Sequence, residues 1–153
     1  MLLYFAGPLF NNTEKEFNKL LAKKIEALGV DVFLPQRDGV EKNKSPYNKM
    51  VREERRHKMF ELDRDKIIES NIFLFVLDGR VPDEGACVEL GIAYADKKLN
   101  NKNRLLVGLQ TDIRAAFLDS KLNPMISVPL DYIAPNEKCL IESLKEFIFN
   151  YQN

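Results

Sequence analysis

Hydrophobic residues along the chain fall into short continuous runs and into longer segments in which they recur every three or four positions. Four runs are typical of strands, and they cover residues 2–6, 30–34, 72–77 and 104–109. The run at 72–77 contains six apolar residues rich in β-branched and aromatic types, which predicts a strand buried on both faces of a sheet. Helical spacing appears between these runs, so strands and helices are expected to alternate.

Three segments have apolar residues suited to helices that pack on a sheet. The first follows Asn11, with Thr13 and Glu16 at the spacing of a capping box and Gly29 as its stop. A second is predicted at about 82–97, with Pro82 in its first turn, where the missing N–H is not needed. The last begins near residue 136. The apolar stripes of the first and last helices are Phe17, Leu20, Leu21, Ile25 and Leu28, and Leu140, Ile141, Leu144, Phe147, Ile148 and Tyr151.

Residues 35–70 are more polar. The stretch 35–47 contains Gly39 and Pro46, which predicts a loop long enough to serve as a lid or a binding loop. A charged helix is expected at 48–70, with its 52–58 segment facing solvent or another subunit. The whole pattern predicts one domain, residues 1–153, with a mostly parallel five-stranded sheet and helices on both faces. This is a doubly wound α/β fold of the Rossmann or flavodoxin type.

Composition narrows the classes of function. Lys plus Arg equals Asp plus Glu at 23 each, which gives no electrostatic reason to expect a nucleic-acid or membrane partner. Polar residues begin at Asn11, so the apolar N-terminus predicts a strand rather than a signal peptide or a membrane span. Cys87 and Cys139 are too few for a disulfide framework, and the single His57 gives no zinc spacing. We therefore expect a cytoplasmic protein with no metal or other cofactor.

Glu89 is a carboxylate set between apolar neighbours, shortly after the most hydrophobic predicted strand. On a helix it would share its face with Gly85, Ala86, Ile92 and Ala93, three of which are small. Sheets of this kind bind ligands beyond the carboxyl ends of their strands. The pattern therefore predicts a carboxylate with room beside it for a ligand.

Gly7 follows the first predicted strand, where many nucleotide-binding proteins place a phosphate loop. The three glycines of a dinucleotide fingerprint and the Gly-Lys-Ser/Thr of a P-loop are both missing, and Pro8 removes a backbone N–H from the turn. Gly7 and Pro8 are consistent with a tight turn that supports a flat base or sugar, and equally with a simple strand-ending turn.

Four segments resemble the nucleoside 2-deoxyribosyltransferase family in the expected order. Leu-Tyr-Phe-Ala-Gly-Pro-Leu-Phe at 3–10 resembles the family's first strand and glycine turn, and Asp63 with Ile-Ile-Glu-Ser-Asn at 67–71 resembles the helix before its central strand. Pro-Asp-Glu-Gly-x-x-Val-Glu-Leu-Gly at 82–91 and Leu-Asn-Pro-Met at 122–125 resemble two further family segments. The resemblance implies transfer of 2-deoxyribose between nucleobases, with hydrolysis as a side reaction and without a cofactor.

The resemblance implies roles in the reaction for three residues. Glu89 would attack the anomeric carbon and hold the sugar as a covalent ester, and two inversions would retain the configuration. Its charge would also stabilise an oxocarbenium-like transition state, which the missing 2-hydroxyl of the sugar makes easier to reach. Asp63 would protonate the departing base, and Tyr4 would orient Glu89 through a hydrogen bond. Taken alone, Asp63 also suits an exposed helix position and Tyr4 a core position.

The residues predicted to bind the substrate, some from the resemblance and others from their position in the chain, are Asp83, Asn123, Gly7, Phe10, Gly85, Gln36, Arg37 and Met125. Asp83 would hold a sugar hydroxyl, although it also suits a helix cap. Asn123 would reach the 5′-hydroxyl from a neighbouring subunit, so a homo-oligomer, from a dimer to a tetramer or hexamer, would be part of the site. By their position, Phe10 would stack on the base, and Gln36 and Arg37 would donate or accept hydrogen bonds at base edges, although the 35–38 loop departs from the family pattern. The partners would be deoxynucleosides and free nucleobases.

Other functions remain open at this point. A nucleoside or nucleoside 5′-monophosphate N-glycosidase would use water as the acceptor, but Asp83 and Glu84 would repel a phosphate. A non-catalytic nucleotide-binding domain, or a structural oligomer built on the charged helix, would need neither Glu89 nor Asp63. Glu84 has no assigned role, and the segment Thr-Asp-x-Arg at 111–114 suits a cap and a surface ion pair as well as a binding segment.

Overall fold

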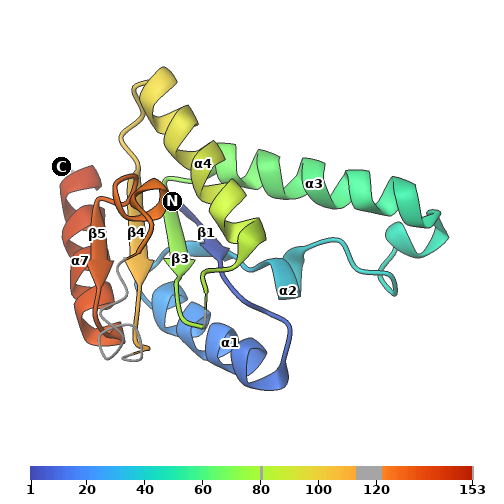
Figure 1. The fold of residues 1–153 in the computed structure, drawn as a ribbon, viewed down its shortest axis with the longest axis horizontal. Coiled ribbons are helices and arrows are strands. Elements are labelled where there is room, and N and C mark those ends of the chain that lie inside the picture. Colours follow the sequence, from blue (N-terminus) through green and yellow to red (C-terminus); the bar gives the residue numbers. More distant parts are fainter. Residues whose placement is uncertain (80, 113–121, 153) are drawn as a thin grey trace.

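The computed structural model describes residues 1–79, 81–112 and 122–152, and its strands form one parallel sheet (Figure 1). The strands are β1 (Leu2–Ala6), β2 (Asp31–Phe33), β3 (Ile72–Val76), β4 (Leu105–Leu109) and β5 (Tyr132–Ala134). They lie in the order β2-β1-β3-β4-β5, and every neighbouring pair is parallel. The predicted α/β class and the five-stranded parallel sheet are confirmed.

Helices cover both faces of the sheet. They are α1 (Asn12–Glu26), α2 (Pro35–Asp38), α3 (Arg52–Glu69), α4 (Glu84–Leu99), α6 (Pro124–Ser127) and α7 (Glu137–Gln152), with one 3₁₀ turn, η1 (Tyr47–Lys49). α1 and α7 pack on one face, and α3 and α4 pack on the other (Figure 1). None of the helices in the described ranges is long and apolar enough to cross a membrane.

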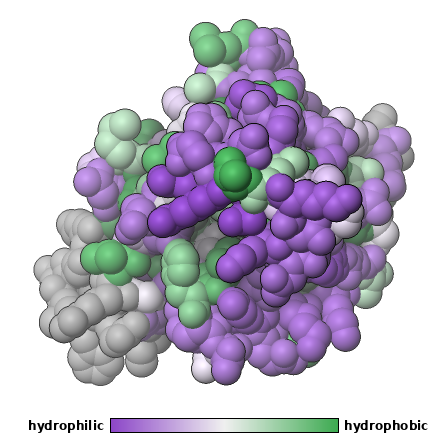
Figure 2. All heavy atoms as spheres, turned by 90° about the vertical axis from the view of Figure 1, so that its right-hand side faces the viewer, coloured by the Kyte–Doolittle hydropathy of each residue, from purple (hydrophilic) through white to green (hydrophobic). Residues whose placement is uncertain are grey.

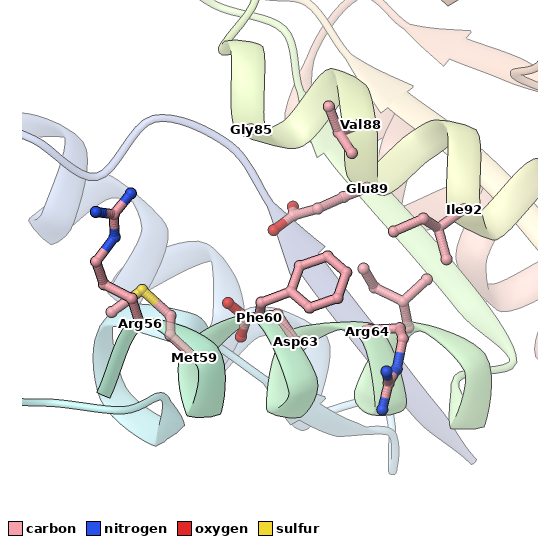
Figure 3. Close-up of a pocket in the computed structure, with 10 residues that line it drawn as sticks. Arg56, Met59, Phe60, Asp63, Arg64, Gly85, Val88, Glu89 and Ile92 are labelled. Atoms are coloured by element: carbon pink, nitrogen blue, oxygen red, sulfur yellow. The ribbon is translucent and has the colours of Figure 1, made fainter. Parts of the chain in front are cut away.

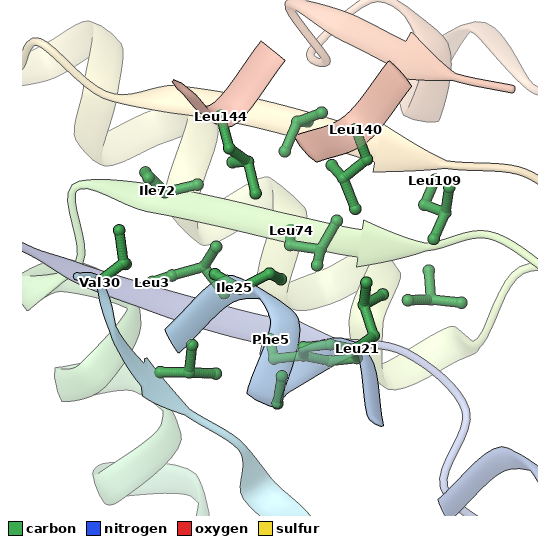
Figure 4. Packing of buried hydrophobic residues seen from close by; sticks show 14 of the residues in the cluster. Leu3, Phe5, Leu21, Ile25, Val30, Ile72, Leu74, Leu109, Leu140 and Leu144 are labelled. Carbon is green, nitrogen blue, oxygen red and sulfur yellow. The ribbon is translucent and has the colours of Figure 1, made fainter. Parts of the chain in front are cut away.

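Alternate residues of each strand enter two separate hydrophobic clusters. In β1, Leu3 and Phe5 pack with α1 and α7, while Tyr4 and Ala6 face α3 and α4. The first cluster is shown in Figure 4, where Leu21 and Ile25 of α1 and Leu140 and Leu144 of α7 lie against the strands. All five residues of β3 are buried, as expected for a central strand that is covered on both faces.

The chain order places a topological switch between β1 and β3. α1 connects β1 to β2 on one side of the sheet, whereas the chain from β2 crosses through α3 to reach β3 on the other side of β1. The segments after β1 and β3 therefore leave toward opposite faces of the sheet, the first to α1 and the second to α4. A crevice at such a point is the usual ligand site of an open parallel sheet.

Three local predictions were wrong. The capping box of α1 uses Asn11 and Glu14 rather than Thr13 and Glu16, because the helix begins two residues earlier than expected. Pro82 precedes the N-cap of α4 instead of lying in its first turn. The polar stretch 35–47 contains the short helix α2, which begins at Pro35, a residue whose fixed φ suits a first helical turn.

The Asn11 cap is expected to contribute to stability. Asn11 Oδ1 accepts a hydrogen bond from the Glu14 N–H at 2.9 Å, and the Glu14 carboxylate accepts one from the Asn11 N–H at 3.1 Å. Asn11→Ala should lower the free energy of unfolding by about 1 kcal/mol, measured by urea denaturation. Asn12→Ala, one residue along and already helical, is the control and should leave stability nearly unchanged. Equal losses in the two variants would show that the cap is not the cause.

α3 is attached to the rest of the protein by its C-terminal part. Of its 18 residues, Ile67 alone is fully buried, and the N-terminal half extends away from the sheet (Figure 1). Figure 2 shows the end of the molecule toward which α3 points: its surface is mostly hydrophilic, with a hollow near the centre of the view. The prediction that the charged 52–58 segment lies at the surface is confirmed.

Candidate active site

Tyr4 lies in the middle of β1, and its ring is held between two other aromatic rings. The strand register puts it beside Phe33 of β2 and Phe73 of β3, and its ring stacks on both, at centroid distances of 5.6 and 5.8 Å. Its hydroxyl donates a hydrogen bond to Oε1 of Glu89 at 2.8 Å. Burial, followed by the nearby charges of Glu89 and Asp63, raises the pKa of Tyr4, so the phenol stays protonated and remains a donor. The predicted contact is present.

Glu89 extends from α4 toward α3 (Figure 3). Burial is the largest cause that raises its pKa, and the carboxylates of Asp63 and Asp83 raise it further, while the Tyr4 hydrogen bond lowers it. The resulting pKa is about 7, against an ordinary value of 4.5. Glu89 therefore changes between its neutral and charged forms near neutral pH, which is typical of a carboxyl group in an active site.

Asp63 lies on α3, and its side chain shares the cleft with Glu89. Burial raises its pKa to about 6. Its Oδ1 atom is buried and has no hydrogen-bond partner among the described residues, and such a group in a folded protein calls for a ligand, a water or a functional role. A carboxyl group that is neutral at mildly acidic pH and has an unused oxygen is suited to donating a proton to a ligand.

The cleft between α3 and α4 has a volume of about 370 Å³. Most of its walls are apolar side chains, with the two carboxyl groups inside it (Figure 3). Its lining residues are Arg56, Met59, Phe60, Asp63, Arg64 and Ile67 of α3, and Gly85, Val88, Glu89 and Ile92 of α4. An apolar cleft with a few convergent polar groups is the usual form of a small-molecule site.

Gly85 and Asp83 shape the end of the cleft at the start of α4. Gly85 lines the cleft, and a Cβ atom there would lie 3.2 Å from Asp83 Oδ1, so a side chain would crowd this end. Asp83 is the N-cap of α4, and its Oδ1 accepts a hydrogen bond from the Ala86 N–H at 2.8 Å. The capping role that the sequence indicated is confirmed, and Asp83 still raises the pKa of Glu89. Ala86 and Ala93, expected beside Glu89, lie in the core instead of the cleft.

Gly7 and Phe10 follow β1 and do not line the cleft. Gly7 has φ of +153°, and a Cβ atom would lie 2.9 Å from Val76 Cβ, so glycine permits a close approach of this turn to β3. The side chain of Phe10 is 77% exposed, which leaves its ring free to contact a ligand. The structure thus explains Gly7 by packing and leaves the predicted role of Phe10 open.

Gln36 and Arg37 of α2 contact the α1 side of the protein. Gln36 accepts a hydrogen bond from the buried Asn18 at 3.1 Å and donates one to the Lys15 carbonyl at 2.8 Å. Arg37 pairs with Glu26 at 2.7 Å, and its bond to Asp38 is the largest cause of its raised pKa. Neither residue lines the cleft, so contact with a base would require them to exchange these partners.

Asn123 and Met125 also lie outside the cleft of their own chain. Asn123 is the N-cap of α6, and its Oδ1 accepts a hydrogen bond from the Met125 N–H at 2.9 Å. Met125 is 80% exposed. Both positions are thus compatible with contact to another subunit.

The segment after β4 supports the end of β3 instead of reaching the cleft. Asp78 accepts hydrogen bonds from the N–H groups of Thr111, at 2.6 Å, and Asp112, at 2.9 Å. Arg114, the last member of that predicted segment, lies outside the described residues. Within the described ranges, no group of three or more His, Cys, Asp or Glu side chains is arranged to hold a metal ion.

Part of the α3 wall of the cleft is formed by residues that were not predicted from the sequence. Arg56 and Phe60 line the cleft, seven and three residues before Asp63 on the same helical face. The guanidinium of Arg64 lies over the ring of Phe60, with its Cζ atom 5.8 Å from the ring centroid. Helical spacing from Asp63 would have identified Arg56 and Phe60 once Asp63 was assigned to a site.

Comparison with known proteins identifies the family of this chain. The family model described as nucleoside 2-deoxyribosyltransferase matches residues 3–147, nearly the whole chain. The chain belongs to this family. A search of curated proteins finds no match. Membership indicates a glycosyltransferase and nucleoside substrates, and it confirms the resemblance found in the sequence.

Two solved structures extend the family comparison to the fold. A conserved protein from Enterococcus faecalis V583 is 27% identical, with a TM-score of 0.72 over 95% of this chain and 98% of that one. The 2-deoxyribosyltransferase from Bacillus psychrosaccharolyticus is 20% identical, with a TM-score of 0.72 over 94% of this chain and 96% of that one. At this identity the second likeness concerns the fold alone.

Proposed function

We propose that this protein transfers 2-deoxyribose between nucleobases through a covalent intermediate on Glu89. The observation that carries the proposal is the pairing of Glu89, held by Tyr4, with the neighbouring carboxyl group of Asp63 inside an apolar cleft. Family membership supports the same reaction class. A charged Glu89 and a neutral Asp63 give the nucleophile and the acid that cleavage of an N-glycosidic bond requires.

In the first half-reaction a carboxylate oxygen of Glu89 forms a bond to C1′ of the deoxynucleoside. The bond from C1′ to the base nitrogen breaks, and its electron pair stays with the base, which takes a proton from Asp63. Phe60, Val88 and Ile92 form apolar walls of the cleft, and a bound nucleoside would displace water from them. The loss of water strengthens the attraction between the charged Glu89 and the developing positive charge on the sugar.

In the second half-reaction a nitrogen of an incoming base attacks C1′ and displaces Glu89 as a carboxylate. Asp63, now ionised, accepts the proton that the incoming base loses. Each half-reaction inverts C1′, so the product keeps the original configuration. When water takes the place of the base, the same steps release free deoxyribose, and transfer becomes hydrolysis.

The test of this function is an exchange assay. The protein is incubated with deoxyinosine and free adenine, and new deoxyadenosine is detected by chromatography. Release of hypoxanthine without deoxyadenosine would indicate an N-glycosidase, and no reaction with several donors would reject an enzymatic function. Deoxyinosine 5′-monophosphate serves as a comparison donor, because Asp83 and Glu84 at the start of α4 should disfavour its phosphate.

We further propose that Asn123 and Met125 complete the cleft of a neighbouring subunit. They lie outside their own cleft, and Met125 is largely exposed. Asn123→Ala should then reduce transfer, and mixing this variant with a Glu89 variant should restore part of the activity in mixed oligomers. Unchanged activity of Asn123→Ala, or mixtures no more active than their parts, would contradict this arrangement.

Tyr4→Phe should change how transfer depends on pH. The wild-type pair should give a bell-shaped profile with its maximum between about pH 6 and 7, because Glu89 must be charged and Asp63 neutral. The Tyr4 hydrogen bond lowers the pKa of Glu89, so its loss should raise that pKa further above the pKa of Asp63. Because Glu89 has the higher pKa of the two, this change should move the alkaline limb of kcat/KM to higher pH and lower its maximum. Phe33→Leu, which removes a stacking partner but keeps the hydroxyl, is the control. An unmoved alkaline limb in Tyr4→Phe would contradict the assigned role.

A further inference from the structure

Arg104 is a buried cation on the same side of the sheet as the cleft but outside it. It lies just before β4 and is 2% exposed. Its guanidinium donates to the carbonyl oxygens of Ser70 at 2.8 Å and Ile68 at 2.7 Å, at the end of α3, and to that of Ala93 in α4 at 3.2 Å. One planar side chain therefore joins the two helices that carry Asp63 and Glu89.

Asp96 of α4 completes this connection. Its Oδ2 lies 2.9 Å from Arg104 Nη1 and 2.8 Å from Lys102 Nζ, and Lys102 also donates to the Ile68 carbonyl at 2.9 Å. Burial alone would raise the pKa of Asp96, but its bonds to Lys102 and Asn100 and the charge of Arg104 lower it overall. Both cations meet the end of α3, where the helix dipole favours positive charge.

The connection matters because α3 has one fully buried residue, Ile67, to hold it against the sheet. Its N-terminal half is exposed, and Asp63 lies only five residues before Ile68, about 7.5 Å along the helix axis. A tilt of about 8° at the Arg104 contacts would move Asp63 by about 1 Å at that helix rise. Displacements of this size in an active site can reduce catalysis by about 100-fold.

A contribution to folding stability does not by itself explain why a charged residue, Arg104, is buried here. A buried ion pair is often no more stabilising than apolar side chains of similar volume, so its contribution to folding does not require these residues. Apolar contacts are non-directional, whereas hydrogen bonds and ion pairs fix the relative orientation of the two helices. The three hydrogen bonds of Arg104 and its ion pair with Asp96 fix the end of α3 relative to α4.

We propose that Arg104 is a positioning residue that fixes α3 against α4 and thereby holds Asp63 at its working distance from Glu89. The proposal rests on the reaction assigned above. It predicts that loosening the Arg104 contacts slows the chemical step more than it weakens substrate binding. It also predicts a changed environment for Glu89, although Arg104 does not line the cleft.

The test compares Arg104→Met with the wild type at a temperature where both are folded by circular dichroism. The kcat for transfer should fall by about 10- to 100-fold with little change in KM. The pKa of Glu89, measured by ¹³C NMR of its carboxyl group, should move from about 7 toward its ordinary value as water enters and Asp63 moves away. Arg104→Lys should recover part of the kcat and part of the shift in the Glu89 pKa, since an ammonium can replace only some of the hydrogen bonds of the guanidinium.

Lys97→Met is the matched control. It removes an ion pair of α4 with Asp131, 2.6 Å long, which makes no link to α3, and it should leave kcat and the pKa of Glu89 unchanged. If Arg104→Met does not fold, Asp96→Asn, which keeps the shape of the side chain, replaces it. Folded variants with a lower melting temperature but wild-type kcat and Glu89 pKa would overturn the proposal. If the wild type shows no transfer activity but its Glu89 pKa still changes in Arg104→Met, the proposed function is rejected and the positioning role of Arg104 is retained.

Discussion

Replacing Glu89 with glutamine is expected to reduce transfer from deoxyinosine to adenine by roughly 10³- to 10⁶-fold, the range for removing a catalytic nucleophile. The amide is nearly isosteric and can still accept the Tyr4 hydrogen bond, so the loss reports the missing charge and nucleophile. The measurement is kcat by chromatography of the product. Binding of deoxyinosine, followed by calorimetry, should remain close to that of the wild type.

Glu84→Gln is the control for Glu89→Gln, because Glu84 is an exposed acid of the same helix and does not line the cleft. It should retain wild-type activity. Glu89→Gln should also be at least as stable as the wild type above pH 7. Burial raises the folded-state pKa of Glu89 to about 7, so the wild type loses stability as pH rises toward that value, and the amide does not. Full exchange activity in Glu89→Gln would reject the proposed nucleophile.

Asp63→Asn is expected to reduce kcat by about 10²- to 10⁴-fold with deoxyinosine as donor, the usual contribution of a positioned acid or base. The departing hypoxanthine needs a proton, and the amide cannot supply it. With 4-nitrophenyl 2-deoxyribofuranoside, whose leaving group departs without a proton, formation of the intermediate should be nearly as fast as in the wild type. The measurement is the pre-steady-state burst of nitrophenolate.

Asp65→Asn is the matched control for Asp63→Asn. Asp65 lies two residues along α3, is exposed and pairs with Arg64 at 2.7 Å. It should retain activity with both donors. An equal loss for both donors in Asp63→Asn would show that Asp63 positions the sugar or Glu89 and does not act as the acid.

Most of the fold could be predicted because hydrophobic residues recur along the sequence with the spacing of buried strands and amphipathic helices. β3 is a continuous apolar run, and the amphipathic stripes of α1 and α7 cover one face of the sheet. β5 was not located in the sequence, since its three residues include an exposed Tyr132 and give no alternation long enough to recognise. The start of α1 was misplaced by two residues because Asn11 and Thr13 are both acceptable N-caps with a Glu three residues later.

The candidate site could be predicted only where the identity of a single residue in a sequence motif pointed to it. The meeting of Tyr4 with Glu89 was expected from the family resemblance, and it is present. The raised pKa of Glu89 and the unpaired oxygen of Asp63 depend on how two helices far apart in sequence pack together. The Arg104 contacts depend on backbone carbonyls, which carry no residue identity and leave no pattern in the sequence.

The most direct test of the central claim is to trap the sugar on the protein. The wild type is mixed with deoxyinosine in the absence of any acceptor base, quenched in acid within one turnover, digested and analysed by mass spectrometry. We predict that the peptide containing Glu89 gains the mass of one deoxyribosyl group, and that added adenine before the quench removes it as deoxyadenosine appears. Exchange activity without this adduct, or an adduct on another residue, would contradict the account.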